Sequence, residues 1–383
     1  MTANLYEKNS KYHVMLSWKH HGKRKQKSVG TGIPVQGNNR RSAEQKRKEI
    51  LAEWEDKVAS NFKEILFSDY LIEWLEIARY SIEETTYSGY VRTINNQIAP
   101  YFAKRKIKLH DLKPHHIQSF YGWKMKTSGV SGNTIRRYHA NVHRSLKHAV
   151  QVELIRDNPA AKVILPKQEQ YVPKFYVAEE MRLMLKKLEG EKIEPPVYLA
   201  SWFGMRRGEA LGIRWDEDVD FNTMSIFVNG VIVDKGEGSR EDNLRYKPRA
   251  KTGTSIRGYP MPQEVADYLR QLREKQEENR ALMGNAYNTQ WIDFVCVDAM
   301  GNLIHPEYLS RAFPRFLRRH GLSKIKFREL RDSNASILLD KDVNLRLIQG
   351  WLGHANIKTT IGYTHLKVGA KRKVVAALSE ELA

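Results

Sequence analysis

Five charged residues at short spacings are the first candidates for chemistry in this sequence. Arg206 and Glu209 lie three residues apart in Gly-Met-Arg-Arg-Gly-Glu-Ala-Leu, and Arg328 and Arg331 have the same spacing in Phe-Arg-Glu-Leu-Arg-Asp. Lys251 begins Lys-Thr-Gly-Thr-Ser, a turn-like segment between two strand patterns. Residues three apart share one face of a helix, so each pair can act together. Arginine stays charged and binds two oxygens in a fork, which suits a phosphate group.

A histidine and a tyrosine follow at a fixed distance towards the C-terminus. His354 ends a Leu-Gly-His segment, and Tyr363 lies nine residues beyond it. Taken singly, each feature has an ordinary structural explanation: a surface ion pair, a solvated lysine, a buried tyrosine. Taken together, they supply what metal-free cleavage of a phosphodiester needs, because that reaction uses a nucleophile, cations that hold negative charge and an acid for the leaving oxygen.

The composition favours a nucleic acid as the partner. The chain has 383 residues with 64 lysines and arginines against 44 acids, so its formal net charge is +20. So many positive charges would repel one another in a free compact protein, and a polyanion as the usual partner would offset this repulsion. The single cysteine, Cys296, excludes a disulfide framework and thiolate-bound metal centres. The sequence shows neither a membrane span nor an N-terminal signal core. We therefore expect a cytoplasmic, multidomain protein with no membrane partner.

The most basic stretch spans residues 8–48, with 12 lysines and arginines against one acid. Apolar residues alternate with polar ones over 12–18, which predicts a strand; a second strand is expected over 23–29 and a helix over 41–59. The interpretation is a small sheet with a helix packed on it. A basic sheet face suits a DNA groove, and a solvated hairpin is the alternative. The candidate DNA-binding residues here are Lys23, Arg24, Lys25 and Lys27.

Residues 65–165 predict an all-helical region, because apolar residues recur there at helical spacing. Its last helix, for which Asn133 is the expected N-cap, has one apolar side and a basic remainder. A solvated surface and a phosphate-binding surface explain the basic side equally well. Its candidate DNA-binding residues are Arg136, Arg137, Arg144 and Lys147.

A polar stretch bracketed by prolines follows and predicts a linker. The rest of the chain has the pattern of one larger mixed domain. We expect helices over 178–188 and 195–211, strands over 225–233 and 258–261, and helices again from 263 onwards.

In combination and in this order, the motifs resemble the signature of the tyrosine recombinase (phage integrase) family. That signature has an arginine in Gly-x-Arg-x-x-Glu, a β-hairpin lysine, a His-x-x-Arg pair, a Leu-Gly-His segment and a tyrosine nine residues beyond that histidine. The likeness covers essentially the whole chain and includes the Asn158-Pro159-Ala160 ending of the helical region. The layout is similar to that of integrases of temperate phages and conjugative transposons.

The resemblance implies an α+β multidomain fold. An arm-type DNA-binding domain (1–62) has a small β-sheet and a helix, and an all-helical, SAM-like core-binding domain (63–166) follows it. A linker (167–174) leads to a mostly helical catalytic domain with a small β-sheet (175–383). Residues 374–378 form an apolar stripe after a basic run. The resemblance implies an exchange tail that packs on a neighbouring subunit, and a helix docked on its own domain is the alternative.

The resemblance also assigns roles to the motif residues. Tyr363 would be the nucleophile, because its phenolate leaves readily and the phosphotyrosyl bond stays reversible. Arg206 and Arg331 would clamp the non-bridging oxygens, Lys251 would protonate the departing 5′-oxygen, and His354 would donate to the phosphate or the nucleophile. No metal, ATP or other cofactor is expected, because every catalytic group is a side chain.

Two further positions complete the expected site. Glu209 would orient Arg206 without contacting the substrate itself. Arg328 departs from the family pattern, which has a histidine in that position. Arginine cannot accept a proton near neutral pH. Arg328 could therefore hold phosphate charge and leave the deprotonation of Tyr363 to His354 or water, or it could mark a less active copy.

The resemblance therefore predicts that the protein is the integrase of a mobile element. Integration of a viral genome is one form of this function. The protein would bind core and arm sites on double-stranded DNA and work as a homotetramer, in the nucleoid of a bacterial host. Accessory excision or DNA-bending proteins are compatible with this layout. The alternatives are a type IB topoisomerase-like enzyme and a non-catalytic DNA-binding regulator derived from an integrase.

Overall fold

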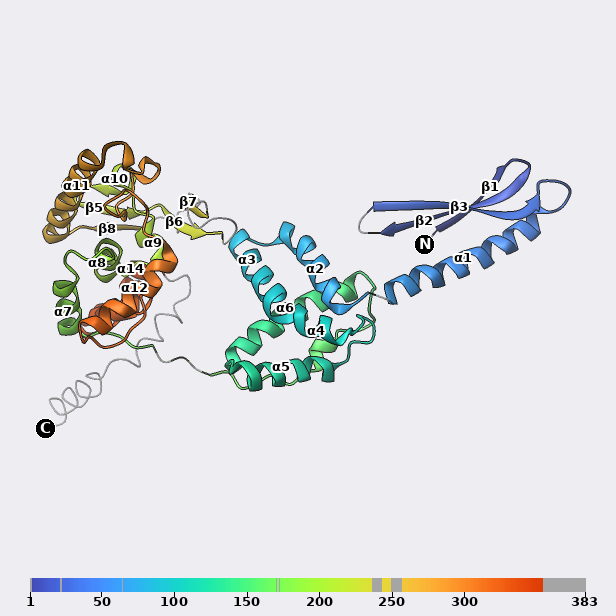
Figure 1. The fold of residues 1–383 in the computed structure, drawn as a ribbon, viewed down its shortest axis with the longest axis horizontal. Coiled ribbons are helices and arrows are strands. Elements are labelled where there is room, and N and C mark those ends of the chain that lie inside the picture. The colour runs from blue at the N-terminus through green and yellow to red at the C-terminus, as the bar shows by residue number, and fades with distance from the viewer. Residues whose placement is uncertain are drawn as a thin grey trace. The chain divides into compact units, whose positions relative to one another are not determined.

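The computed structural model describes residues 2–20, 23–63, 65–169, 171, 173–235, 243–248 and 257–353, and it gives the backbone alone for 19–20, 23–25 and 55–63 (Figure 1). The chain divides into two compact units, Met1–Glu169 and Gln170–Ala383. Within the described ranges, no helix has the length and apolar character that a membrane crossing requires.

The first unit begins with an antiparallel sheet in the order β1-β2-β3, followed by a long helix. The elements are β1 (Thr2–Lys8), β2 (Lys11–His20), β3 (Lys23–Pro34) and α1 (Arg40–Lys63). The alternation predicted for β2 is observed: Val14 and Leu16 are fully buried and pack with Ile50 of α1. The rings of Trp18 and Trp54 also meet, with centroids 5.8 Å apart. The predicted sheet with a helix packed on it is therefore present.

The remainder of the first unit is helical, as predicted. Its elements are α2 (Phe67–Ala78), the 3-10 turn η1 (Arg79–Ser81), α3 (Glu84–Thr93), the π-helical turn η2 (Ile94–Ile98), α4 (Ala99–Arg105), α5 (Pro114–Ser128), α6 (Gly132–Gln151) and the 3-10 turn η3 (Pro159–Lys162). One apolar core joins them, with Leu71, Phe102 and Leu146 fully buried. The expected N-cap of α6 was wrong: the side chain of Ser131, not Asn133, accepts the hydrogen bond from the Thr134 N–H.

The second unit combines helices with two small antiparallel sheets. Its helices are α7 (Ala178–Leu188), α8 (Glu194–Phe203), α9 (Arg207–Leu211), α10 (Trp215–Asp218), α11 (Gln263–Met283), α12 (Pro306–Arg319), α13 (Glu329–Asp340) and α14 (Leu345–Leu352), with the 3-10 turns η4 (Gly284–Ala286) and η5 (Thr289–Trp291). One sheet has the order β4-β5-β8, and β6 pairs with β7. The strands are β4 (Val219–Asp220), β5 (Ser225–Val228), β6 (Gly230–Asp234), β7 (Leu244–Pro248) and β8 (Arg257–Pro260).

The helix predicted over 195–211 is two helices, α8 and α9, separated by a break at Gly204. Gly204 has a φ of +62°, a left-handed conformation that glycine adopts without strain. A Cβ atom on Gly204 would lie 2.5 Å from Cδ2 of Leu352. Position 204 therefore has no room for a side chain, and the break makes Arg206 the N-cap of α9 instead of a mid-helix residue.

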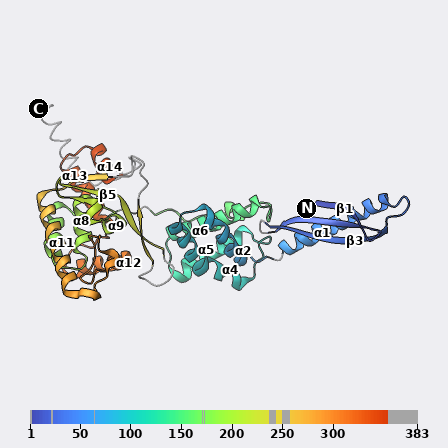
Figure 2. The same ribbon diagram turned by 90° about the horizontal axis from the view of Figure 1, so that it is seen from above.

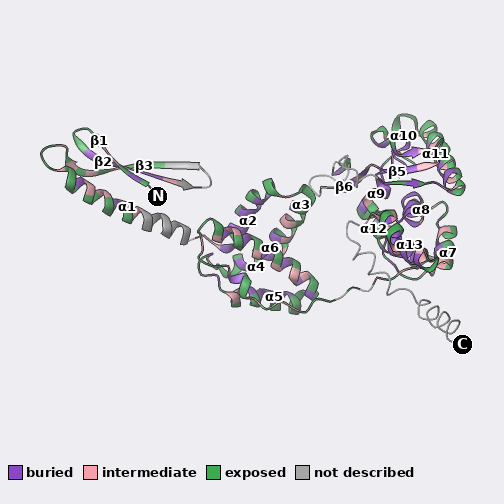
Figure 3. Cartoon of the chain, turned by 180° about the vertical axis from the view of Figure 1, so that it is seen from behind, coloured by how far each residue is buried: buried purple, intermediate pink, exposed green. Residues whose placement is uncertain are grey.

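Helix α13 passes through the interior of the second unit and is buried almost all round. Its buried residues include Arg331, Ser333 and Asn334. Figure 3 colours the buried parts of the chain purple. The amide of Asn334 donates to the carbonyls of Ser201 and Trp202 on α8, at 3.0 Å each. Helices α13 and α14 also pack side by side (Figure 2). Polar groups on α13 are thus held by main-chain acceptors, as buried polar groups require.

Candidate active site

The carboxylate of Glu209 holds both the backbone and the side chain of Arg206 at the start of α9. The backbone N–H of Arg206 donates to Glu209 Oε2 at 2.9 Å, and Arg206 Nη1 donates to Glu209 Oε1 at 2.7 Å. Glu209 is 1% exposed, whereas the side chain of Arg206 is 48% exposed. One edge of the guanidinium is therefore fixed to protein, and a large part of the group remains open to solvent.

Arg331 binds the C-terminal ends of two helices. Its side chain is buried on α13, where Nη1 donates to the carbonyl of Gly204 at 2.8 Å and Nη2 donates to the carbonyl of Leu352. Gly204 caps the C-terminus of α8, and Leu352 is the last residue of α14. Helix C-termini carry partial negative charge, so both contacts favour the buried cation.

Three motif segments that are far apart in the sequence meet at the Leu352–Gly353 turn. Arg206 Nη2 reaches the carbonyl of Gly353 at 3.5 Å, and Arg331 contacts the carbonyl of Leu352. Gly353 has a φ of +63°, so it turns the chain in a left-handed conformation as α14 ends. The glycine of Leu-Gly-His therefore has a conformational role beside the two arginines.

Arg257, at the start of β8, joins this site although the sequence assigned it no role. It is 8% exposed; its Nη2 lies 2.8 Å from Glu209 Oε2, in an ion pair that lacks hydrogen-bond alignment, and its Nη1 donates to the carbonyl of Leu352. The expected strand began at 258, one residue too late. One signal in the sequence could have revealed it. Arg257 lies two residues before Tyr259, so on a strand the two side chains point to the same, inward face. Arg206, Glu209, Arg257 and Arg331 are called the arginine cluster below.

The carboxylate of Glu209 is ionised under all ordinary conditions. Burial alone would raise its pKa, but the charge of Arg257, the backbone N–H of Arg206 and the charge of Arg206 outweigh burial and lower the pKa to about 2. Glu209 is therefore a fixed anion between two guanidinium groups. It can hold Arg206 in place but cannot serve as a proton donor or acceptor near neutral pH.

The structure does not join Arg328 to the arginine cluster. Arg328 is the N-cap residue of α13 and its side chain is exposed, with no hydrogen bond or ion pair to any other residue in the described ranges. Its guanidinium is thus solvated at one end of the helix that carries Arg331. The other three predicted catalytic residues, Lys251, His354 and Tyr363, lie outside the described residues.

The predicted DNA-binding residues of the sheet have different environments. Lys27 is exposed, and its Nζ lies 4.8 Å from the centroid of the Trp54 ring. The side chains of Lys23, Arg24 and Lys25 lie outside the described residues, although their backbone forms the start of β3.

On α6, three of the four predicted DNA-binding residues are exposed. Arg137, Arg144 and Lys147 lie at the surface, and Arg144 Nη1 donates to the Tyr90 hydroxyl at 2.9 Å. Arg136 is partly buried, and its Nε donates to the carbonyl of Pro166 at 2.9 Å. Arg136 therefore fastens the segment after the helix, a structural contact that the basic pattern did not reveal.

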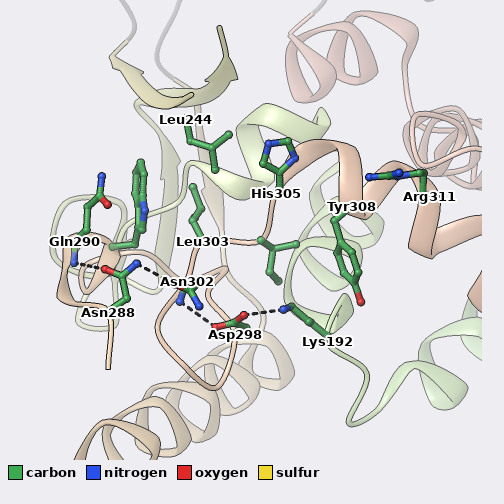
Figure 4. A pocket seen from close by; sticks show the side chains of 12 residues that line it. Lys192, Leu244, Asn288, Gln290, Asp298, Asn302, Leu303, His305, Tyr308 and Arg311 are labelled. Carbon is green, nitrogen blue, oxygen red and sulfur yellow. Dashed lines mark hydrogen bonds and ion pairs between the residues drawn. The ribbon is translucent and has the colours of Figure 1, made fainter. Parts of the chain in front are cut away.

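A cavity of about 320 Å³ lies elsewhere in the second unit (Figure 4). Lys192, at one side of it, forms an ion pair of 2.6 Å with Asp298, and Asn288 donates to Asn302 at 2.9 Å. His305 Nδ1 accepts the N–H of Glu307 and so caps α12. None of its lining residues belongs to the arginine cluster, and these polar groups bind one another, which is typical of a stabilised loop.

Comparisons with known proteins match both units. Residues 180–369 match the family model described as "Phage integrase family", and residues 66–125 match "Phage integrase, N-terminal SAM-like domain". A tyrosine recombinase XerC-like protein of Caldanaerobacter subterraneus subsp. tengcongensis is 28% identical over 360 residues, 90% of either chain. Tyrosine recombinase XerC of Staphylococcus aureus is 30% identical over 223 residues, 57% of this chain and 65% of that protein.

Solved structures have the same fold. The Tn1549 transposon integrase in complex with a circular intermediate DNA has a TM-score of 0.63 at 17% identity, covering 83% of this chain and all of that one. A lambda integrase dimer bound to a COC′ core site has a TM-score of 0.57 at 16% identity, covering 94% of each chain. The predicted α+β fold class, with a small N-terminal sheet, a SAM-like helical region and a mostly helical catalytic region, is therefore confirmed.

The chain belongs to the tyrosine recombinase (phage integrase) family. Members of this family are site-specific recombinases, and this chain is accordingly an enzyme of that class.

Proposed function

We propose that this protein is the integrase of a mobile genetic element, which cleaves and rejoins DNA through a 3′-phosphotyrosyl intermediate. The observation that carries the proposal is the meeting of Arg206 and Arg331 at the Leu352–Gly353 turn, from which the chain continues to His354 and Tyr363. A half-exposed arginine beside a buried one supplies the positive potential that a scissile phosphate needs.

Arg206 would bind the non-bridging oxygens directly, because much of its guanidinium is open to solvent while Glu209 holds the other edge. The Nη groups of Arg331 are already held by the carbonyls of Gly204 and Leu352, so Arg331 would contribute its positive charge from a buried position next to the phosphate site. Both groups are fixed before substrate binds, so little reorganisation is required when negative charge develops on the phosphorane.

The covalent step uses residues outside the described ranges. The Tyr363 oxygen attacks phosphorus, its proton passes to His354 or water, and the 5′-oxygen leaves with a proton from Lys251. The reverse reaction, with a 5′-hydroxyl from another strand, completes the exchange, so the bond energy is conserved and ATP is not needed. Arg328 takes the position of the family's histidine and would hold phosphate charge without accepting a proton.

The proposed architecture is a clamp on double-stranded DNA. Residues 1–62 would bind arm sites through Lys23, Arg24, Lys25 and Lys27, and residues 63–166 would bind the core site through Arg137, Arg144 and Lys147. Residues 167–174 would link them to the catalytic domain, 175–383. Four copies would exchange strands through a Holliday junction. A solved structure of similar fold is described as a lambda integrase tetramer bound to a Holliday junction, which supports this assembly.

A nicked suicide substrate made from the element ends tests the proposal. Cleavage of such a substrate releases the short fragment between the cut and the nick, which carries the free 5′-hydroxyl and diffuses away, so the covalent adduct accumulates and is seen on a denaturing gel. We expect an adduct with the wild-type chain and none with Tyr363→Phe, which removes one oxygen and leaves DNA affinity unchanged.

Tyr308→Phe is the matched control, because Tyr308 is a partly exposed tyrosine of the second unit that lies outside the arginine cluster. The control should form adduct at the wild-type rate. An adduct with Tyr363→Phe would show that another residue is the nucleophile. DNA binding without any wild-type adduct would favour a non-catalytic regulator, and relaxation of supercoils without strand exchange would favour a topoisomerase.

A further inference from the structure

The buried guanidinium of Arg257 is shared between the two halves of the arginine cluster. Its Nη2 pairs with the Glu209 carboxylate, which also holds Arg206. Its Nη1 binds the carbonyl of Leu352, which also accepts from Arg331. Arg257 thus contacts both the carboxylate that orients Arg206 and the Leu352 carbonyl that Arg331 also binds.

Arg257 and its two partners lie at or near the ends of three secondary-structure elements. Arg257 begins β8 and directly follows residues 249–256, the segment that contains Lys251. Glu209 lies in the first turn of α9, and Leu352 ends α14. The hydrogen bond from Nη1 to the carbonyl of Leu352 has a set direction, and the rigid, planar guanidinium places its charge against the Glu209 carboxylate in an ion pair without hydrogen-bond alignment. A flexible lysine ammonium would not reproduce this arrangement.

The Leu352–Gly353 turn fits around the same side chain. A Cβ atom on Gly353 would lie 2.5 Å from Nη1 and 2.6 Å from Cδ of Arg257. A side chain at 353 would therefore require the Arg257 side chain or the turn itself to shift. Because His354 follows immediately, the position of Arg257 constrains where the chain leaves α14 towards His354 and Tyr363.

We propose that Arg257 is a positioning residue of the recombination reaction, which holds Glu209 and the Leu352–Gly353 turn in the arrangement that aims Arg206 at the scissile phosphate. This inference rests on the proposed function. Arg257 does not touch the phosphate: it is buried behind Glu209, and it acts through Arg206 and through the turn that leads to His354.

A purely structural arginine and a positioning arginine make different predictions. Loss of a structural arginine would lower stability and affect every substrate alike. Loss of a positioning arginine would weaken the response to phosphate charge, because Arg206 would no longer be held in its phosphate-binding orientation. A substrate with a methylphosphonate at the cleavage site separates the two, since a neutral methyl group there replaces one charged non-bridging oxygen and reduces the need for an aligned arginine.

The experiment compares Arg257→Gln, Arg257→Lys and the benchmark Arg206→Ala in the full-length chain. Arg214→Gln is the matched control: Arg214 is 21% exposed and pairs with buried Asp218 at 3.5 Å, and neither residue belongs to the arginine cluster. Three quantities are measured: affinity for the intact DNA site, single-turnover cleavage of the suicide substrate with a phosphodiester or a methylphosphonate, and amide hydrogen exchange in peptides of α9 and α14.

Arg257→Gln should cleave the phosphodiester roughly ten- to hundredfold more slowly, the effect of losing one charged hydrogen bond in the transition state. Its DNA affinity should stay near that of the wild type. On the methylphosphonate the defect should shrink, as it should for Arg206→Ala. Exchange should rise in the α9 and α14 peptides. Arg257→Lys should fold and keep most of the rate defect, so it carries the test if the glutamine variant does not fold. Arg214→Gln should match the wild type on both substrates.

Two results would overturn the inference while leaving the proposed function intact. One is wild-type cleavage by both Arg257 variants. The other is an equal rate defect on both substrates, together with a loss of DNA affinity. If the wild-type chain itself forms no adduct, the proposed function fails and the inference fails with it.

Discussion

Replacing Glu209 by glutamine is the sharpest test of the electrostatics of the arginine cluster. Glutamine has nearly the shape of a protonated glutamic acid and can still accept and donate hydrogen bonds. The substitution therefore removes the charge of a 1%-exposed carboxylate that pairs with Arg206 at 2.7 Å and with Arg257 at 2.8 Å. It leaves two guanidinium groups facing a neutral amide.

The expected loss of stability follows from the pKa of Glu209. Burial opposes ionisation, but the nearby arginine charges and the Arg206 N–H lower the pKa from 4.5 to about 2. A pKa difference of about 2.5 means that the site prefers the charged to the neutral form by about 3 kcal/mol. Glu209→Gln should therefore destabilise the second unit by about 3 kcal/mol at pH 7, within the range for breaking a buried ion pair.

The same pKa fixes the sign of the pH dependence. The folded-state pKa is lower than the unfolded one, so the stabilisation is complete above about pH 4.5 and is lost as the pH falls towards 2. At pH 4 about three quarters of unfolded chains carry a proton on Glu209, whereas almost no folded chain does. The difference between wild type and Glu209→Gln should therefore be about 1 kcal/mol smaller at pH 4 than at pH 7.

Urea unfolding followed by hydrogen exchange in peptides of α8, α9 and α13 measures these differences, because those peptides report on the second unit alone. Glu179→Gln is the control: Glu179 pairs with Arg182 at 2.9 Å, but both side chains are 74% exposed. That variant should lose less than about 0.5 kcal/mol. A difference below about 1 kcal/mol at pH 7 for Glu209→Gln, or one that does not change with pH, would refute the electrostatic reasoning.

Four further outcomes are expected. Gly353→Ala should slow single-turnover cleavage at least tenfold and lower the melting temperature, because it adds a Cβ at a φ of +63° and 2.5 Å from Arg257; wild-type values would exclude a tight turn. Arg328→Ala should cleave roughly ten- to hundredfold more slowly, whereas Arg328→His should be tolerated and acquire a rate dependence near pH 6.5; equal rates at every pH would place this residue outside the site. Removal of residues 1–60 should abolish footprints on arm sites and spare core-site cleavage. Cleavage should persist in excess EDTA, and a strict Mg²⁺ requirement would indicate a different chemistry.

Much of the fold could be predicted because its signals are local. Strand alternation at Val14 and Leu16 and helical spacing at Leu71 and Leu146 report burial directly, and the structure buries each of them. The spacing of charged motif residues predicted that Arg206 and Glu209 would pair, and they do, at 2.7 Å. The pairing arises from a helix cap instead of a continuous helix face.

The features that the sequence did not reveal depend on contacts between distant segments. Gly204 interrupts a good helical pattern as the left-handed C-cap of α8, and the close approach of Leu352 leaves no room for a side chain there. Arg257 lay outside the predicted strand and was assigned no role, and in the fold it contacts Glu209 on α9 and the carbonyl of Leu352 on α14. Arg136 belongs to the basic side of a helix, yet its Nε donates a hydrogen bond to the carbonyl of Pro166, 30 residues further along the chain. No local pattern encodes such partners.

The charge balance of the arginine cluster explains why burying so many cations is tolerable in a recombinase. The cluster has three guanidinium groups and one carboxylate, so two positive charges are not matched within it. The carbonyls of Gly204, Leu352 and Gly353 provide partial negative charge at helix ends, which stabilises the cations without neutralising them. A phosphodiester has one negative charge, and the phosphorane formed on attack has two. In the proposed reaction, the net positive charge of these four residues would therefore fit the transition state better than the ground state, which is the condition for catalysis rather than for binding alone. Glu209→Gln raises this net charge by one and Arg257→Gln lowers it by one, whereas Arg257→Lys leaves it unchanged and so tests position separately from charge.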